Sequence, residues 1–211
     1  MTDFSSAEVS QMKQIHEKWG GLIQAAAHTS TAPEAFLAAL VAGESNGDAA
    51  AKRFEPSVFE RLLEVCLGKR AAFSVAGIHR PLGAVDLLGY ICKTGTLPSF
   101  VDELRNAADL ATSFGLTQIM GWHMVELYQE DKLEKMKTDP AGQLEMTMQL
   151  LVVFANKYDL DLAKETEAMF TCWNTGEPDG HTYDPNYVAN GQRRIQIYQQ
   201  ITAPPPAGVT Q

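Results

Sequence analysis

The chain has 211 residues, of which 45% are hydrophobic and 20% charged, as in globular proteins that bury one core. Its formal net charge is −9, so the basic surface of nucleic-acid-binding proteins is missing and no nucleic-acid partner is expected. No apolar run approaches the roughly 20 residues that span a membrane. Residues 1–10 lack the basic and then apolar layout of a secretory signal, which predicts a protein made in the cytoplasm.

Cysteine and histidine usage points away from a disulfide framework or a metal centre. The cysteines are odd in number, widely spaced and embedded in apolar segments: Cys66, Cys92 and Cys172. This pattern predicts buried free thiols in a reducing compartment. The histidines are scattered, and neither His123 nor His181 has a partner at metal-ligand spacing. We therefore expect no metal and no cofactor.

Most of the chain has the apolar spacing of helices, which predicts a mostly α fold in a single domain over residues 1–202. Ser5 and Glu8 have capping-box spacing at the start of an N-terminal helical extension (residues 1–30), which Gly20-Gly21 would bend or interrupt. Further helices are predicted over residues 33–44, 56–68, 83–93, 98–112, 140–158, 160–173 and 185–201, with another apolar segment over 115–130. The tail over residues 203–211 contains three consecutive prolines and is predicted to be disordered.

Glu44 stands where an amphipathic helix would place another apolar side chain. Leu37, Leu40 and Val41 lie at positions i, i+3 and i+4 of one helical face, and Glu44 follows at i+7. Gly47 is a helix stop, so the carboxylate lies at the negative end of the helix dipole. Desolvation and the dipole would both raise the pKa of Glu44, as a general acid for glycosidic bond cleavage requires. On spacing alone, the alternative is a charged helix end that points to water.

Three separated segments carry a family likeness. Residues 38–47 read Ala-Ala-Leu-Val-Ala-Gly-Glu-Ser-Asn-Gly, and residues 113–121 read Ser-Phe-Gly-Leu-Thr-Gln-Ile-Met-Gly. Residues 173–176 read Trp-Asn-Thr-Gly, with a Tyr-Val pair at 187–188. In this order they resemble the Glu-Ser catalytic helix, the Gly-Leu-x-Gln-Ile-Met cleft segment, and the aromatic-Asn-x-Gly loop with its Tyr-Val helix in the lysozyme-like superfamily of peptidoglycan-cleaving enzymes. The resemblance implies a lysozyme-like helical domain.

The resemblance also implies roles for single residues. Glu44 would be the general acid. The residues expected to contact the glycan are Ser45, Gln118, Met120, Trp173, Asn174 and Tyr187. Trp122 and Tyr183 offer further flat faces for sugar rings, although each aromatic side chain has a place in the core as its alternative.

The subfamily is indicated by the segment that follows the predicted catalytic helix. Residues 53–61 read Arg-Phe-Glu-Pro-Ser-Val-Phe-Glu-Arg and resemble the Arg-Phe-Glu-Pro-His-x-Phe motif of phage-type N-acetylmuramidases, with Ser57 in place of histidine. This favours hydrolysis of the β-1,4 bond between N-acetylmuramic acid and N-acetylglucosamine. The Trp-Asn-Thr-Gly segment favours the alternative, a lytic transglycosylase that forms 1,6-anhydro ends. A non-catalytic wall-binding or phage structural module is the second alternative.

An inverting hydrolase needs a second carboxylate that holds a water molecule. Glu55 is the candidate, because the charge of Arg53 beside it would keep it ionised. Its alternatives are an ion pair without catalytic role and a cap for the helix that Pro56 opens; Asp179 and Asp184 are further candidates. A transglycosylase needs no such group, and Tyr187 would assist it.

The partner implied by the resemblance is the peptidoglycan glycan strand, bound by a monomeric protein. Without a signal peptide, such an enzyme would reach the cell wall through a phage or prophage lysis system, or from a virion.

Overall fold

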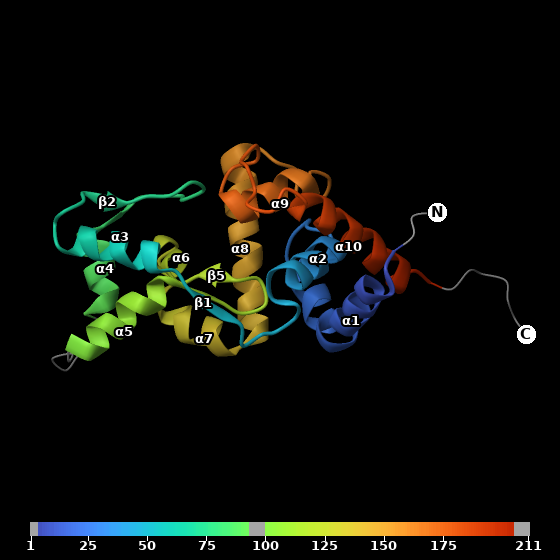
Figure 1. Ribbon diagram of the computed structural model, residues 1–211, viewed down its shortest axis with the longest axis horizontal. Coiled ribbons are helices and arrows are strands. Elements are labelled where there is room, and N and C mark those ends of the chain that lie inside the picture. The colour runs from blue at the N-terminus through green and yellow to red at the C-terminus, as the bar shows by residue number, and fades with distance from the viewer. Residues whose placement is uncertain (1–3, 93–99, 205–211) are drawn as a thin grey trace, which may run out of the picture.

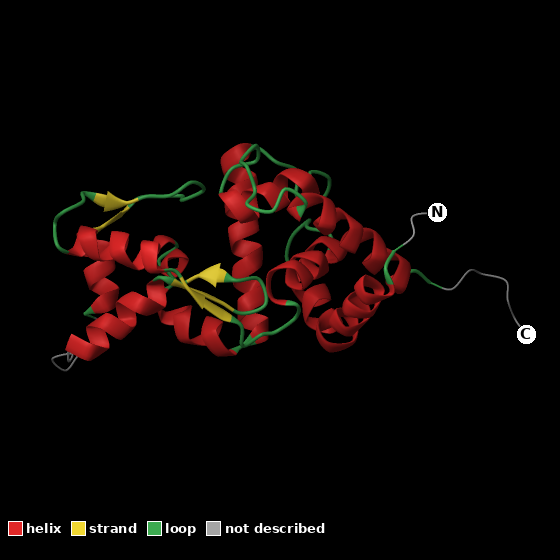
Figure 2. Ribbon diagram, viewed as in Figure 1, coloured by secondary structure: helices red, strands yellow, loops and turns green. Residues whose placement is uncertain are grey.

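The computed structural model describes residues 4–92 and 100–204 (Figure 1). Within these residues ten α-helices dominate, joined by one 3-10 turn and five short strands (Figure 2), which confirms the predicted mostly α class. Among the helices of the described ranges, none is both long and apolar enough to cross a membrane. Most of the tail predicted to be disordered lies outside the described residues.

The helices form two lobes on either side of the long helix α8 (Pro140–Tyr158) (Figure 1). The terminal lobe contains α1 (Ser6–Ala27), α2 (Glu34–Ser45), α9 (Thr166–Thr175) and α10 (Tyr187–Thr202). The middle lobe contains α3 (Pro56–Cys66), α4 (Ala84–Ile91), α5 (Phe100–Leu110), α6 (Trp122–Glu126) and α7 (Leu133–Thr138). Each lobe has its own apolar core. Helix α8 supplies both, with Leu151 in the core of the terminal lobe and Leu150 in that of the middle lobe.

Helix α1 begins at the predicted capping box. The Glu8 backbone N–H donates to Ser5 Oγ at 3.2 Å, and the Ser5 backbone N–H donates to Glu8 Oε2 at 3.2 Å. The predicted interruption at Gly20-Gly21 is wrong, because the helix continues to Ala27. Its apolar face, with Met12 and Ile23 fully buried in the terminal-lobe core, outweighs the roughly 1 kcal/mol that each glycine costs a helix.

Helix α2 is the centre of the terminal lobe. It lies between α1 and α10, and every residue from Ala35 to Ala42 is buried. The predicted single apolar stripe is therefore too narrow, since the helix is apolar all round. It stops where predicted: Asn46 and Gly47 adopt left-handed backbone conformations, with φ of 54° and 77°. A Cβ atom at Gly47 would come within 2.5 Å of Ile15 Cδ1, so glycine is also needed there for close packing.

A small antiparallel sheet in the middle lobe was not predicted. Its strand order is β1 (Lys52–Phe54), β4 (Thr112–Phe114) and β5 (Ile119–Met120), and Ser113 pairs with both Arg53 and Met120. A separate pair joins β2 (Ala72–Phe73) and β3 (Leu82–Gly83). The segment over 115–130 thus contains a hairpin strand followed by α6.

The start of α9 also differs from the prediction. The helix begins at Thr166 instead of at residue 160. The Asp161 carboxylate accepts a hydrogen bond from the Ala163 backbone N–H at 2.9 Å, and the Asp161 N–H donates to Glu165 Oε2 at 2.6 Å. These local bonds satisfy the backbone in a turn and compete with a helix.

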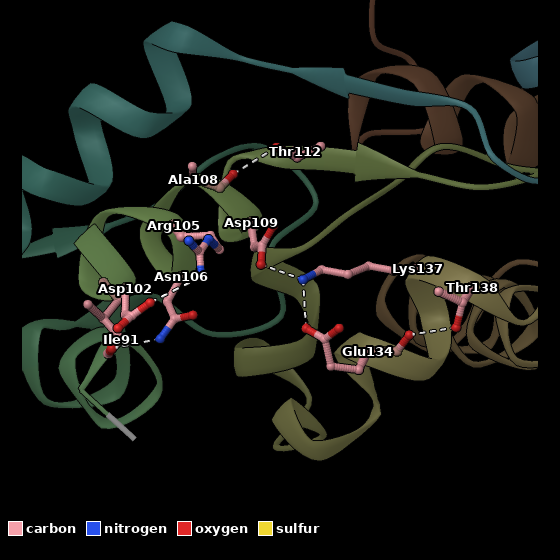
Figure 3. A network of polar contacts seen from close by, with 10 residues as sticks. All are labelled: Ile91, Asp102, Arg105, Asn106, Ala108, Asp109, Thr112, Glu134, Lys137 and Thr138. Carbon is pink, nitrogen blue, oxygen red and sulfur yellow. Dashed lines mark hydrogen bonds and ion pairs between the residues drawn. The ribbon is translucent and has the colours of Figure 1, made fainter. Parts of the chain in front are cut away.

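Polar contacts hold α5 against its neighbours in the middle lobe (Figure 3). Lys137 Nζ on α7 contacts the Asp109 carboxylate on α5 and donates to Glu134 Oε1 at 2.7 Å. Asn106 Nδ2 on α5 donates to the Ile91 carbonyl at the end of α4, at 2.9 Å. The end of α5 leads directly into β4, so these contacts also fix the sheet.

Residues 74–80 cross from β2 towards the upper end of α8 (Figure 1). On the middle-lobe side, the His79 backbone N–H donates to the Glu126 carboxylate. On the other side, Lys157 Nζ of α8 donates to the Ile78 carbonyl at 3.0 Å. Gly77 lies against Gly176, where a Cβ atom would come within 2.6 Å of Gly176 Cα. The segment therefore connects the two lobes on the side opposite the sheet.

Candidate active site

Glu44 is the penultimate residue of α2, at the point where the chain leaves the terminal lobe for β1 of the middle lobe. Ser45 fixes this junction: its Oγ donates to the Leu116 carbonyl at 2.8 Å and contacts the Val41 carbonyl at 3.3 Å. Leu116 belongs to the turn between β4 and β5. The predicted acid therefore lies where the two lobes meet.

Tyr187, the first residue of α10, contacts Glu44 directly. Its phenolic O–H donates to Glu44 Oε1. The Tyr187 ring also packs edge-on against Phe170 of α9, with ring centroids 6.1 Å apart. Glu44 and Tyr187 are distant in the chain and belong to two of the segments that resemble the lysozyme-like superfamily. The fold brings them into hydrogen-bond contact.

Burial sets the protonation of this pair. Desolvation raises the pKa of Glu44, and the weaker opposing influences are the Tyr187 hydrogen bond and the charges of Arg53 and Arg194. The direction agrees with the sequence-based expectation, with desolvation as its largest cause. The pKa of Tyr187 is also raised, first by burial and then by the Glu44 charge. Tyr187 therefore keeps its proton at neutral pH and donates it in the hydrogen bond.

Glu55 and Arg53 form an ion pair, with Arg53 Nε 2.6 Å from Glu55 Oε1. Glu55 occupies the N-cap position of α3, but its side chain makes no capping hydrogen bond. Of the two alternatives to a catalytic role for Glu55, the structure therefore contains the ion pair with Arg53 but not the capping hydrogen bond. Because the Arg53 charge also acts on Glu44, one guanidinium links the two carboxyl groups electrostatically. Side chains in this ion pair are 74% and 30% exposed, so Glu55 stays accessible to water.

Gln118 is occupied within the protein. Its Nε2 donates to the carbonyls of Gly115 at 3.0 Å and Ala51 at 3.2 Å. Its Oε1 accepts from Ser113 Oγ at 2.9 Å. Both amide protons are therefore used to hold the β4–β5 turn against β1, and only one lone pair of Oε1 is left for a ligand. Gln118 also has a positive φ of 56°, which the same bonds stabilise.

A small cavity of about 80 Å³ gathers three residues that the sequence assigned to the glycan. Its lining residues are Gln118, Ile119, Met120, His123, Leu150, Phe154 and Trp173. Trp173 also donates from Nε1 to the Thr117 carbonyl at 3.2 Å. Sequence reasoning did not place His123 here. Its Nδ1 lies 2.6 Å from Oε2 of Glu126, which is 2% exposed, so a buried carboxylate orients the ring.

Three other residues that the sequence predicted to contact the glycan do not line this cavity: Asn174, Trp122 and Tyr183. Trp173 and Asn174 form the last turn of α9 instead of a loop, and Gly176 ends the helix with φ of 85°. Asn174 is exposed. Trp122 is 5% exposed and packs edge-on against Phe73 at 5.4 Å, so it belongs to the core. Tyr183 is fully exposed.

The two further candidates for the second carboxylate lie in the loop before α10. Asp179 and Asp184 are both exposed there. Asp184 Oδ1 accepts from the Asn186 backbone N–H at 2.8 Å, and the Asp184 carbonyl accepts from the Tyr187 N–H at 3.0 Å. Asp184 therefore helps to start α10 and to place Tyr187.

Comparison of the chain with known protein families, with curated proteins and with solved structures gave no match.

Proposed function

We propose that this protein is a peptidoglycan-cleaving enzyme of the lysozyme-like superfamily, an N-acetylmuramidase with Glu44 as general acid. Glu44 carries the proposal, because a half-buried carboxyl group with a raised pKa lies at the junction of two lobes. Such a group holds its proton until a leaving oxygen takes it.

Tyr187 supports the acid role by its geometry. Its O–H donates to Oε1, so that oxygen is the carbonyl oxygen of the protonated carboxyl group. The transferable proton is then on Oε2, which forms no hydrogen bond with another described residue. Protonation of the glycosidic oxygen by Oε2 would leave an oxocarbenium-like sugar and an ionised Glu44.

Glu55 would complete an inverting hydrolase. The Arg53 guanidinium lies 2.6 Å from Glu55 Oε1, and the exposure of the Glu55 side chain gives a water molecule access to it. Arg53 would hold the base in place while its charge limits how far the Glu44 pKa rises.

The contact between Tyr187 and Glu44 also favours the alternative, a lytic transglycosylase. In that reaction a hydroxyl group of the substrate replaces water, and a tyrosine beside the acid assists without a second carboxylate. A wall-binding module without activity is the second alternative.

The proposed substrate is the glycan strand of the cell wall. A phage or prophage lysis system is the proposed route by which a protein made in the cytoplasm reaches it.

The proposal is tested by Glu44→Gln on purified peptidoglycan. This change keeps size and hydrogen bonding but removes the transferable proton, so the rate of turbidity loss should fall by orders of magnitude. Glu167→Gln on an exposed face of α9 is the matched control and should keep wild-type activity. Near-wild-type activity of Glu44→Gln would refute the general-acid role, and an inactive wild type would favour the binding module.

Mass spectrometry of the products separates the two enzyme classes. Reducing N-acetylmuramic acid ends support the hydrolase, and a strong rate loss in Glu55→Gln would then identify the base. Products lighter by one water carry 1,6-anhydro ends and would establish the transglycosylase instead.

A further inference from the structure

Arg194 of α10 lies beside the candidate acid. Its charge acts on both Glu44 and Tyr187. A Cβ atom built at Gly43 would be 3.1 Å from Arg194 Nη1, so the guanidinium lies close to the backbone immediately before Glu44. The side chain is half-buried.

This guanidinium has no partner of its own. Within residues 4–92 and 100–204, Arg194 makes no hydrogen bond and no ion pair. Its two counterparts are paired: Arg193 Nη2 lies 2.9 Å from Glu8 Oε2, and Arg53 pairs with Glu55. The chain has 26 acidic and 17 basic residues, so acidic partners are in excess. A half-buried cation that is nevertheless left unpaired has all five N–H donors available to a ligand.

Glu44 does not fill the role of that partner. Desolvation raises the pKa of its carboxyl group, which favours the neutral form, and its Oε1 already accepts the Tyr187 hydrogen bond. A neutral carboxyl group gives a guanidinium little electrostatic stabilisation. No described residue places an anion in hydrogen-bond or ion-pair contact with Arg194, so this position is open to the anion of a ligand.

We propose that Arg194 binds a carboxylate of the substrate, next to the bond that Glu44 cleaves, and so selects glycan that carries acidic groups. This inference rests on the proposed function. A planar guanidinium accepts a carboxylate through two parallel hydrogen bonds, which gives orientation as well as affinity. Peptidoglycan offers carboxylates from two sources: the stem peptide, and the lactyl group of muramic acid once the peptide has been removed.

Three forms of one peptidoglycan preparation test the inference. The first is intact. The second is treated with an amidase, which removes the stem peptides and frees the lactyl carboxylates. The third is coupled with methylamine, which neutralises the carboxylates and leaves the glycan unchanged.

For Arg194→Gln we expect kcat/KM to fall about tenfold, the order of one lost charge-assisted interaction, on the carboxylate-bearing form that Arg194 recognises. On the neutralised form the loss should be less than about twofold on the same scale. A selective loss on intact peptidoglycan assigns the stem peptide, and one on amidase-treated strands assigns the lactyl group. Arg194→Lys, which keeps the charge without the planar fork, should lose less than Arg194→Gln.

Arg193→Gln is the matched control, because it removes the same charge from the adjacent position of α10 and breaks only the pair with Glu8. Its relative rates on the three forms should equal those of the wild type. An equal loss in Arg194→Gln on all three forms, with circular dichroism unchanged, would overturn the inference and assign Arg194 to positioning Glu44. If the wild type cleaves none of them, the proposed function itself fails.

Discussion

Burial of Glu44 links its proposed role as an acid to stability at the level of a single residue. A carboxyl group whose pKa is raised in the folded state destabilises that state once it is ionised. The penalty is full above the folded-state pKa, shrinks as the pH falls below that value, and is absent below the unfolded-state pKa. An acid placed for proton transfer thus costs folding free energy that a neutral side chain would not.

We therefore expect Glu44→Gln to raise the midpoint of thermal unfolding at pH 7. A gain of about 1 kcal/mol corresponds to about 2–4 °C in a domain of this size. The gain should shrink as the pH falls from the folded-state pKa towards about 4 and vanish below that value, where the wild-type carboxyl group is protonated in both states. Calorimetry over this pH range measures it, with Glu167→Gln as an exposed control. A lower midpoint at pH 7 would show that the carboxylate stabilises the fold.

Tyr187→Phe should change the pH profile in a defined direction. The Tyr187 hydrogen bond lowers the pKa of Glu44, so its loss raises that pKa further. The alkaline limb of kcat/KM, which reports deprotonation of the acid, should move to higher pH. The rate at the optimum should also fall severalfold, because the acid loses its orientation. A limb that moves to lower pH would contradict the assignment of Glu44 as the acid.

The sequence predicts the setting of Glu44 well and that of Gln118 poorly. The apolar residues before Glu44 imply a desolvated carboxyl group, and the helix is buried over residues 35–42 while desolvation raises the Glu44 pKa. A motif likeness to a cleft glutamine contains no sign that both amide protons of Gln118 are used by Gly115 and Ala51. Nor does local sequence connect Arg194 to Glu44, since the electrostatic influence of Arg194 on Glu44 depends on how α10 packs across α2.

At the level of elements, local chemistry is what makes boundaries predictable. The capping box at Ser5 starts α1, and Asp139 followed by Pro140 starts α8 at the predicted residue. The strands β1, β4 and β5 are two or three residues long and too short for an alternating pattern, so only their pairing defines them.

The bond between Ser45 and Leu116 is the element-level contact that joins α2 to the sheet. Ser45→Ala removes a hydrogen bond worth about 1 kcal/mol and frees the β4–β5 turn from the end of α2. We expect a lower unfolding midpoint and reduced kcat with an unchanged pH profile, because Ser45 does not bond to the Glu44 carboxyl group. Ser10→Ala on the exposed face of α1 is the control. Wild-type stability of Ser45→Ala would mean that the lobes do not depend on this bond.

For the whole molecule, the two-lobed shape concentrates cations at a junction within an acidic protein. Arg53 comes from the middle lobe and Arg194 from the terminal lobe, and both act on Glu44. The chain as a whole has a formal net charge of −9. Long-range forces on an anionic glycan are therefore repulsive, whereas the short-range contacts proposed at the site are attractive.

Because the long-range repulsion is screened by salt more strongly than the short-range contacts, we expect activity to rise with moderate salt. Between about 10 mM and 150 mM ionic strength the Debye length falls from about 30 Å to about 8 Å, which screens the repulsion between the −9 protein and the wall. The half-buried contact at Arg194 is screened less, so binding at the site should persist while encounter becomes faster. Initial rates of peptidoglycan lysis over a salt series measure the effect, and the neutralised peptidoglycan should respond far less. A steady fall in rate from the lowest salt onwards would mean that attraction to a local basic surface dominates the encounter.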